Sequence, residues 1–358
     1  MVAGPEDASD TPPEGLTRDR ARLVKTIELA DGGAVAIASP GARATGTAPM
    51  EVRAPHGSVV VADIVFANQV SGINLDAIAL VNGDFVVAFS QQGNIIYQVF
   101  GADGSAVSPP DVMGFDAGRA NTMNGPPDVL AHADSGFALF YSVQSVLPAW
   151  RAQRFENDGT PAAEDFLTKV SKAQQVSAAE LVNGNVVVTY REVAGFDPDV
   201  RFDILRPDGT LQVQFREIAS DWSSNNDLHA LEVVALADGG FVILVADHKR
   251  DLIKMQRFDA NGTLDSSSQA LNLTANADAI LAGVGSVRDI EAVLLDGGDI
   301  QMSLIDGNGQ TQTIVFDAYN SLRDLNKART RRQVMGASTV SSARETSTFL
   351  TGTTGMTT

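Results

Sequence analysis

Short apolar runs alternate along the chain with turn residues, and one arrangement of the two recurs six times. An apolar run ends in Asp-Gly, Asn-Gly or Ser-Gly, and a second apolar run follows at once, as in Leu80-Val81-Asn82-Gly83-Asp84-Phe85-Val86. The turns fall at residues 32, 83, 135, 184, 239 and 297, which lie 49 to 58 residues apart. A period of this length indicates a protein built from repeated structural units.

Within one repeat, the pattern predicts short antiparallel strands. In the second copy, residues 76–80 and 84–89 flank Asn82-Gly83, which favours a two-residue hairpin turn because both positions tolerate positive φ. Residues 95–100 form a third apolar run, and a second turn at residues 102–105 leads into a weaker extended segment. Each repeat is therefore expected to fold as a small sheet of four strands.

The second turn also recurs, in the form Phe-Asp/Glu-x-x-Gly-Thr. It is found at residues 155–160 and 258–263, and residues 205–210 fit the same frame. The first copy is degenerate, with Pro55-His56-Gly57-Ser58 at this place, and in the last copy Asp306-Gly307-Asn308-Gly309 joins the second and third strands.

Four short strands cannot bury both faces of a sheet, whereas sheets arranged radially around an axis can. We therefore predict an all-β fold, a six-bladed β-propeller of four-stranded antiparallel blades over residues 22–318, with Arg22–Glu28 completing the last blade. An array of β-sandwiches or a β-solenoid is the alternative. Residues 1–21 are expected to be a disordered arm, and residues 319–358 a short helix followed by a docking tail rich in Ser, Thr and Gly.

The repeat Leu-x-Asn/Asp-Gly-x-Phe-Val-Val, followed by Arg-Phe-Asp-x-x-Gly-Thr, resembles the propeller-like repeats of about 50 residues in large bacterial secreted and cell-surface proteins. The resemblance covers residues 22–318 and implies a β-rich extracellular scaffold, often without enzymatic activity. Many of those proteins carry calcium-binding Gly-Gly-x-Gly-x-Asp arrays, but this chain has none, so their calcium roll is not carried over.

The chain has 358 residues, no cysteine and a net charge of −18. Disulfides and thiolate metal sites are therefore excluded. Residues 321–358 carry +4, so the remaining residues carry −22, and an acidic body of this kind repels nucleic acid and anionic membrane surfaces. No secretory signal and no membrane-spanning segment is recognised, so we expect a virion or cell-surface location reached by a signal-less route.

The C-terminal segment has a different pattern from the repeats. Leu322, Leu325 and Ala328 follow a helical spacing, and a basic cluster follows them at Arg329, Arg331 and Arg332. The end of the chain, Ser347–Gly355, resembles the short Thr-Leu-Thr-Gly-x-x-Gly tags of some tailed-phage virion proteins. Three hypotheses remain open: the basic segment folds back on the acidic body, Phe349 and Leu350 bind a protein partner by strand addition, or the end is simply disordered.

Candidate chemistry is sparse. The four histidines, His56, His132, His229 and His248, form no metal-ligand or catalytic motif, and each is interpreted as a surface residue. Asp306-Gly307-Asn308-Gly309 resembles half of a calcium loop but lacks the downstream carboxylate, so a hairpin turn is favoured and no cofactor is expected. Asp203, Asp208 and Asp259 lie in or beside the repeated strands and turns, where a structural role explains them.

Two connections are longer than blade geometry requires, and long loops on a rigid scaffold often bind ligands. They are residues 114–128, with Arg119 and Asn121, and residues 219–229, with Trp222, Asn225, Asn226 and His229. Trp222 is suited to stacking on a sugar or anchoring a partner, or it packs under its own loop. Trp150 is expected in the core.

These observations favour a non-catalytic binding or structural propeller on a virion or bacterial exterior. It would present loops to a glycan or receptor and dock through its tail. A secreted adhesion module of a bacterial surface protein is an alternative, as is a propeller glycosidase or lyase with acidic residues at the mouth of the central channel.

Overall fold

The computed structural model describes the repeat region of the chain with short gaps. The described residues are 21–40, 47–68, 75–91, 94–112, 127–133, 136–143, 149–162, 166–167, 173–192, 199–218, 228–247, 252–265, 271–272, 287–295, 297–306 and 311–317. All regular structure in these residues is β-strand. None of them belongs to a helix that is long and apolar enough to cross a membrane.

The described strands form six antiparallel sheets, and each sheet takes its strands from consecutive positions in the chain. The first sheet contains β1 (Ala21–Glu28), β2 (Ala34–Pro40), β3 (Thr47–Arg53) and β4 (Val59–Asn68). The second contains β5 (Leu75–Ala79), β6 (Phe85–Gln91), β7 (Asn94–Phe100) and β8 (Asp111–Val112). The third contains β9 (Asp128–Ala131), β10 (Phe137–Val143), β11 (Ala149–Phe155) and β12 (Phe166–Leu167).

The remaining three sheets follow the same order. The fourth contains β13 (Ala173–Glu180), β14 (Val186–Glu192), β15 (Asp199–Leu205) and β16 (Leu211–Glu217). The fifth contains β17 (Leu228–Ala235), β18 (Phe241–Asp247), β19 (Leu252–Phe258) and β20 (Leu271–Asn272). The sixth contains β21 (Val287–Leu294), β22 (Asp299–Asp306) and β23 (Thr311–Asp317).

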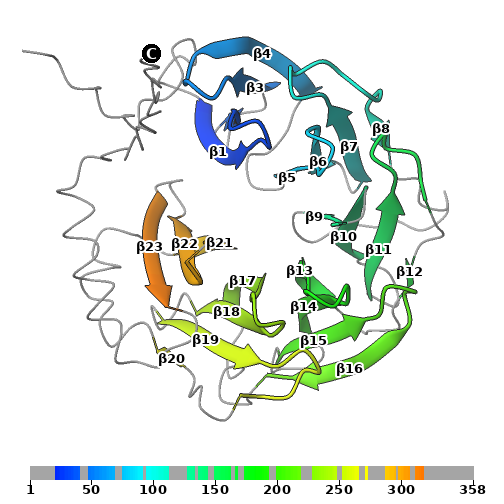
Figure 1. Cartoon of the computed structure of the whole chain (residues 1–358), viewed down its shortest axis with the longest axis vertical. Coiled ribbons are helices and arrows are strands. Elements are labelled where there is room, and N and C mark those ends of the chain that lie inside the picture. Colours follow the sequence, from blue (N-terminus) through cyan, green and yellow to red (C-terminus); the bar gives the residue numbers. More distant parts are fainter. Residues whose placement is uncertain are drawn as a thin grey trace, which may run out of the picture.

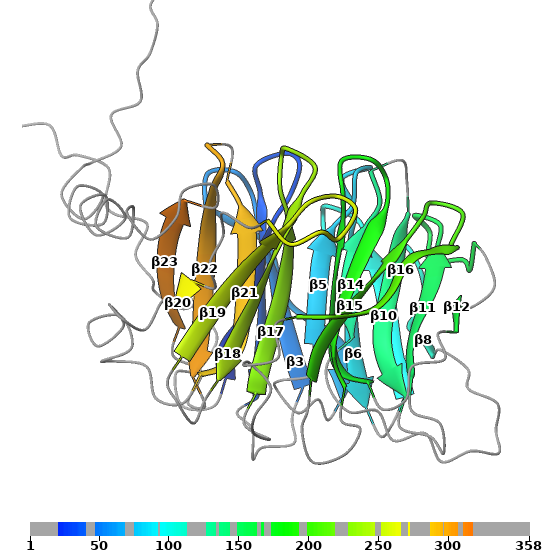
Figure 2. The same ribbon diagram turned by 90° about the horizontal axis from the view of Figure 1, so that it is seen from below.

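The six sheets are arranged around a common axis, with β1, β5, β9, β13, β17 and β21 innermost (Figure 1). This arrangement is that of a β-propeller, which confirms the predicted all-β propeller fold and rules out the sandwich array and the solenoid. The first and second turns of the sheets lie together on one face of the ring, as the side view shows (Figure 2).

The expected closure of the ring is wrong in one respect. Residues 22–28 do not complete the last sheet, because β1 pairs with β2 in the first sheet, with Ile27 opposite Val35. The turn after β1 closes a local hairpin, in which Leu29 N donates to Gly33 O at 2.8 Å. Among the described residues, the sixth sheet has three strands and each of the other five sheets has four.

The first turn of each repeat differs in detail from the expected two-residue hairpin. In the second sheet, Gly83 N donates to Leu80 O at 3.0 Å and Leu80 N to Asp84 O at 2.7 Å. Three residues therefore form the loop, a type I turn followed by Gly83 at φ +93°. Asn82 does not take positive φ; its side chain accepts the Asp84 N–H at 3.1 Å. In the sixth sheet the positive-φ residue is Gly298, at +81°.

The second turn has the same geometry, even where its sequence is degenerate. In the first sheet, Gly57 N donates to Ala54 O at 2.8 Å, although Pro55 and His56 replace the usual residues. In the fourth and fifth sheets, Asp208 accepts the Thr210 N–H at 2.9 Å and Asp259 accepts the Thr263 N–H at 2.8 Å. The structural role expected for these two aspartates is confirmed.

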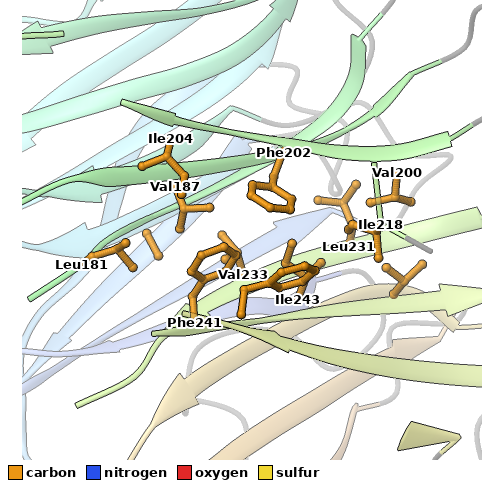
Figure 3. Packing of buried hydrophobic residues seen from close by; sticks show 13 residues of the cluster. Leu181, Val187, Val200, Phe202, Ile204, Ile218, Leu231, Val233, Phe241 and Ile243 are labelled. Atoms are coloured by element: carbon orange, nitrogen blue, oxygen red, sulfur yellow. The ribbon is translucent and has the colours of Figure 1, made fainter. Parts of the chain in front are cut away.

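Apolar side chains fill the space between consecutive sheets. Five buried clusters join the first sheet to the second, and so on up to the fifth and sixth. Between the fourth and fifth sheets, Phe202 lies 5.3 Å from Phe241 and 4.9 Å from Phe258, centroid to centroid (Figure 3). Trp150 is fully buried between the third and fourth sheets, as expected. Among the described residues, no such cluster joins the sixth sheet to the first.

Candidate functional site

Each innermost strand carries a polar residue at the same place in its sheet. Each of these residues pairs with a residue of the second strand in its own sheet, and the partner lies twelve positions later in the chain. They are Lys25, Asp76, Asp128, Ser177, Glu232 and Glu291, which pair with Ile37, Ala88, Phe140, Thr189, Leu244 and Ser303. We call these six residues the polar ring; they combine four carboxylates, one ammonium group and one hydroxyl.

Three successive members of the polar ring join neighbouring sheets in the same way. Asp76 accepts the Val129 N–H at 2.7 Å, and Asp128 accepts the Ala178 N–H at 2.6 Å. Ser177 accepts the Val233 N–H at 3.1 Å. In each case the donor is the residue that follows the next ring member in the chain. A buried N–H without a partner destabilises a fold, so these side chains stabilise the contacts between the inner strands.

Lys25 is the cationic centre of the polar ring. Its ammonium group forms an ion pair with Asp76 and lies 3.9 Å from Glu291 Oε1. Burial by itself would lower the pKa of Lys25, but the carboxylates of Asp76, Glu291 and Glu232 outweigh it and raise that pKa. Lys25 therefore remains charged, and it links the second sheet to the first and the first to the sixth.

Glu291 is a ring member whose carboxyl group has a raised pKa. Burial raises its pKa, and the nearby Lys25 offsets only part of this effect. Its side chain is still 37% exposed. Glu232 accepts a hydrogen bond from the Ser177 hydroxyl at 3.0 Å. The polar ring thus brings a carboxyl group of raised pKa close to the partly buried ion pair of Lys25 and Asp76.

A second buried carboxylate, Asp203 on β15, lies between the third and fourth sheets. It accepts hydrogen bonds from Trp150 Nε1 at 3.1 Å, the Phe215 N–H at 2.6 Å and the Tyr190 hydroxyl at 3.3 Å. Burial raises its pKa although these donors oppose the shift. Phe215 takes a positive φ of 55° at this contact. The structural role expected for Asp203 is confirmed.

Most of the residues proposed from the sequence are not described by the structure. This applies to Arg119, Asn121, Trp222, Asn225 and Asn226, to the tail residues Arg329, Arg331, Arg332, Phe349 and Leu350, and to the glycines of the calcium-like loop at 307–309. His229 is described as part of β17, where it is the extra residue of a β-bulge between Leu228 and Ala230.

Among the described histidines, one differs from expectation. His56 is exposed, as predicted, but His132 is partly buried, and its Nδ1 lies 3.0 Å from Glu180 Oε2. The interpretation of His132 as an ordinary surface residue was therefore wrong. The described part of the chain contains no group of three His, Cys, Asp or Glu residues that could hold a metal ion.

The polar ring itself was missed in the sequence. A readable signal existed, because in the first five repeats the ring residue lies seven positions before the turn residue at 32, 83, 135, 184 or 239. In the sixth repeat, Glu291 lies six positions before residue 297. At this spacing, a polar residue interrupts the apolar run of each innermost strand.

Comparison with known proteins supports the fold and leaves the activity open. No family model matches the chain, and no curated protein matches it. Among solved structures, the α-L-arabinofuranosidase Arb93A from Fusarium graminearum is 13% identical, with a TM-score of 0.52 over 86% of this chain and 95% of that chain. The fucose-specific lectin from Aleuria aurantia is 10% identical, with a TM-score of 0.54 over 84% of this chain and 95% of that chain. At these identities the likeness shows the β-propeller fold alone.

Proposed function

We propose that the chain is a non-catalytic binding and structural propeller with six blades, one for each sheet, that acts on a virion or a bacterial exterior. The supporting observation is the use of the polar ring. Asp76, Asp128 and Ser177 are each held in a contact between neighbouring sheets. Side chains that hold the architecture together in this way are poorly placed to react with a substrate.

The acidic residues of the turns support the same proposal. Asp158 and Asp208 accept hydrogen bonds from the N–H and hydroxyl groups of Thr160 and Thr210, and so close their own turns. The two long connections with Arg119 and Trp222 join β8 to β9 and β16 to β17, which are the last and first strands of neighbouring sheets. We assign recognition of a glycan or receptor to these connections.

A glycan array read together with an assay for reducing ends tests this proposal. The chain should bind at least one glycan and release no sugar from it. Trp222→Ala should weaken binding about tenfold, the loss expected for an aromatic anchor, without changing Tm. Val182→Ser, in the first turn of the fourth sheet, is the matched control and should bind normally. Binding that survives Trp222→Ala together with Asn225→Ala and Asn226→Ala would contradict the assignment of this loop.

The tail and the location need a separate experiment. We propose that residues 333–358, with Phe349 and Leu350, attach the propeller to a protein partner on a particle. Deletion of 333–358 should abolish cofractionation with particles from a lysate and leave the folded ring intact. Release of the full chain into the medium from intact cells would favour the adhesion-module alternative instead.

A glycosidase is the second candidate, because one observation favours it. Glu291 has a raised pKa and shares Lys25 with the carboxylate of Asp76, and two carboxyl groups in different environments are what an acid-catalysed glycoside hydrolysis requires. Glu291 would then donate the proton to the leaving oxygen. Release of reducing ends by the chain, and its loss in Glu291→Gln, would establish this function and overturn the non-catalytic one.

A further inference from the structure

The sixth sheet presents an unusual face toward the first sheet. In the second sheet, Val86, Ala88 and Tyr97 point into the apolar cluster shared with the third sheet. Counted from the paired turn residues Leu80–Asp84 and Leu295–Asp299, Gln301 and Ser303 of the sixth sheet correspond to Val86 and Ala88. Thr313 takes the place of Tyr97, because it pairs with Ser303 as Tyr97 pairs with Ala88. Polar side chains of the sixth sheet thus lie at positions that are buried core positions in the second sheet.

The first sheet differs in the same way on the face that it presents to the sixth. In the second, third and fifth sheets, the equivalent face carries two stacked phenylalanines, at the start of the second strand and the end of the third. An example is Phe241 and Phe258, with ring centroids 5.2 Å apart. In the first sheet the equivalent pair is Ala34 and Arg53. Thr26 lies where the second sheet has the buried Ala77, and it is exposed. The two faces therefore lack the large apolar groups that join the other sheets.

Exposure shows that these faces are only partly covered by one another. Val293 on β21 is 54% exposed, whereas its counterpart Ile78 packs against the cluster between the second and third sheets. Between the described residues of the two sheets, the ion pair of Lys25 with Glu291 bridges the gap at 3.9 Å. We call these facing surfaces of the sixth and first sheets, which include Val293, Ser303, Thr313, Thr26 and Ala34, the seam.

The chain itself offers an occupant that continues directly from the sixth sheet. The last described strand, β23 of the sixth sheet, ends at Asp317, and residues 318–358 follow directly. Residues 319–332 combine an apolar stripe of Leu322, Leu325 and Ala328 with the basic cluster of Arg329, Arg331 and Arg332. As a helix they would be about 21 Å long, short enough to lie along β21, which is about 26 Å long.

Charge favours the same occupant. The seam carries two accessible carboxylates, the exposed Glu28 and the partly exposed Glu291. The body of the chain carries −22 and residues 321–358 carry +4, so the tail is attracted to the body over a long range. A second copy of this acidic body would be repelled.

We propose that residues 319–332 dock in the seam, with their apolar stripe against Val293 and Ala34 and their basic cluster near Glu28 and Glu291. The segment closes the ring between the sixth and first sheets. This closure is intramolecular, so it does not depend on the ligand of the loops or on the partner of residues 333–358.

Thiol labelling of the full chain tests the docking, because the natural sequence contains no cysteine. Val293→Cys reports on the seam, and Val182→Cys, 73% exposed in the first turn of the fourth sheet, is the matched control. With N-ethylmaleimide as the probe, Val293→Cys should label about tenfold more slowly than Val182→Cys, since covered sites react only through local opening. Adding Arg329→Glu, Arg331→Glu and Arg332→Glu should remove most of this protection.

Two further variants keep the test decisive. Thr313→Cys is a second reporter in case Val293→Cys disturbs the fold, and Leu322→Asp with Leu325→Asp should expose both reporters as the charge reversal does. Equal labelling of Val293→Cys and Val182→Cys in the full chain would overturn the proposal. Protection that survives the tail substitutions, or that grows with protein concentration together with a dimer in sedimentation, would assign the seam to another occupant and would also overturn it.

Discussion

The contact between the fourth and fifth sheets and the seam between the sixth and first occupy equivalent places in the ring, yet they are built from different residues. The first buries Phe202, Phe241 and Phe258 in one aromatic cluster. At the seam, Ala34 and Arg53 take the place of the stacked phenylalanine pair, and Ser303 pairs with the polar-ring residue Glu291. Among the described residues, the five contacts between consecutive sheets from the first to the sixth are held by buried apolar clusters. The seam between the sixth and first sheets is instead bridged by the ion pair of Lys25 with Glu291.

The largest change in stability is expected at Lys25, because it contacts Asp76 of the second sheet and also Glu291 at the seam. Asp76→Ala should lower the free energy of unfolding by about 3–5 kcal/mol, because it removes the nearest carboxylate from the partly buried Lys25 and the acceptor from the buried Val129 N–H. Glu291→Ala, which removes the more distant carboxylate at the seam, should cost about 1 kcal/mol or less. Urea unfolding measures both. A larger loss for Glu291→Ala would mean that the seam, and not the inner joint, holds Lys25.

A second pair of substitutions sharpens the comparison at matched positions. Leu244 and Ser303 both pair with a polar-ring residue of their own sheet. Leu244 is fully buried in the cluster shared by the fifth and sixth sheets. Leu244→Ala should lose about 2–4 kcal/mol through the cavity it leaves, whereas Ser303→Ala should change stability by about 0.5 kcal/mol or less. Equal losses in thermal or urea unfolding would show that the seam is packed like the other contacts.

The smallest effect is a pH dependence that depends on Glu291. Burial raises its pKa in the folded state, so the folded chain holds this proton more tightly than the unfolded chain. The resulting stabilisation is complete below about pH 4 and is lost as the pH rises through the folded pKa. Relative to Glu291→Gln, the natural chain should therefore lose stability as the pH rises from that point.

An exposed aspartate gives the control of opposite sign. Hydrogen bonds from Thr210 lower the pKa of Asp208, so its stabilisation is present at neutral pH and is lost as the pH falls through the folded pKa. Urea unfolding at several pH values should give slopes of opposite sign when each natural residue is compared with Glu291→Gln or Asp208→Asn. Slopes of the same sign would contradict the assignment for Glu291.

The repeated architecture could be predicted because it is encoded locally. Turn residues such as Asn82-Gly83 and the β-branched runs beside them determine hairpins within a few residues. The six strand groups and their order were confirmed for this reason. Even the degenerate turn at Pro55–Ser58 keeps the geometry, because Gly57 supplies the positive φ that the turn requires.

The closure of the ring and the polar ring could not be predicted in the same way. Residues 22–28 read as a strand in any case, and their pairing with β2 instead of the last sheet depends on the three-dimensional path of the chain. Likewise, Lys25, Asp76 and Glu291 are distant in sequence and meet only because every innermost strand runs beside the axis. The bulge that places His229 as an extra residue in β17 leaves no mark in the apolar pattern.

Because every sheet is assembled from neighbouring strands, each can form as soon as its own stretch of chain has left the ribosome. Most contacts within a sheet are close in sequence, which favours rapid, stepwise folding. No strand of the described chain has to wait for a distant terminus to complete it. A circular permutant cut between two sheets should therefore still form every hairpin.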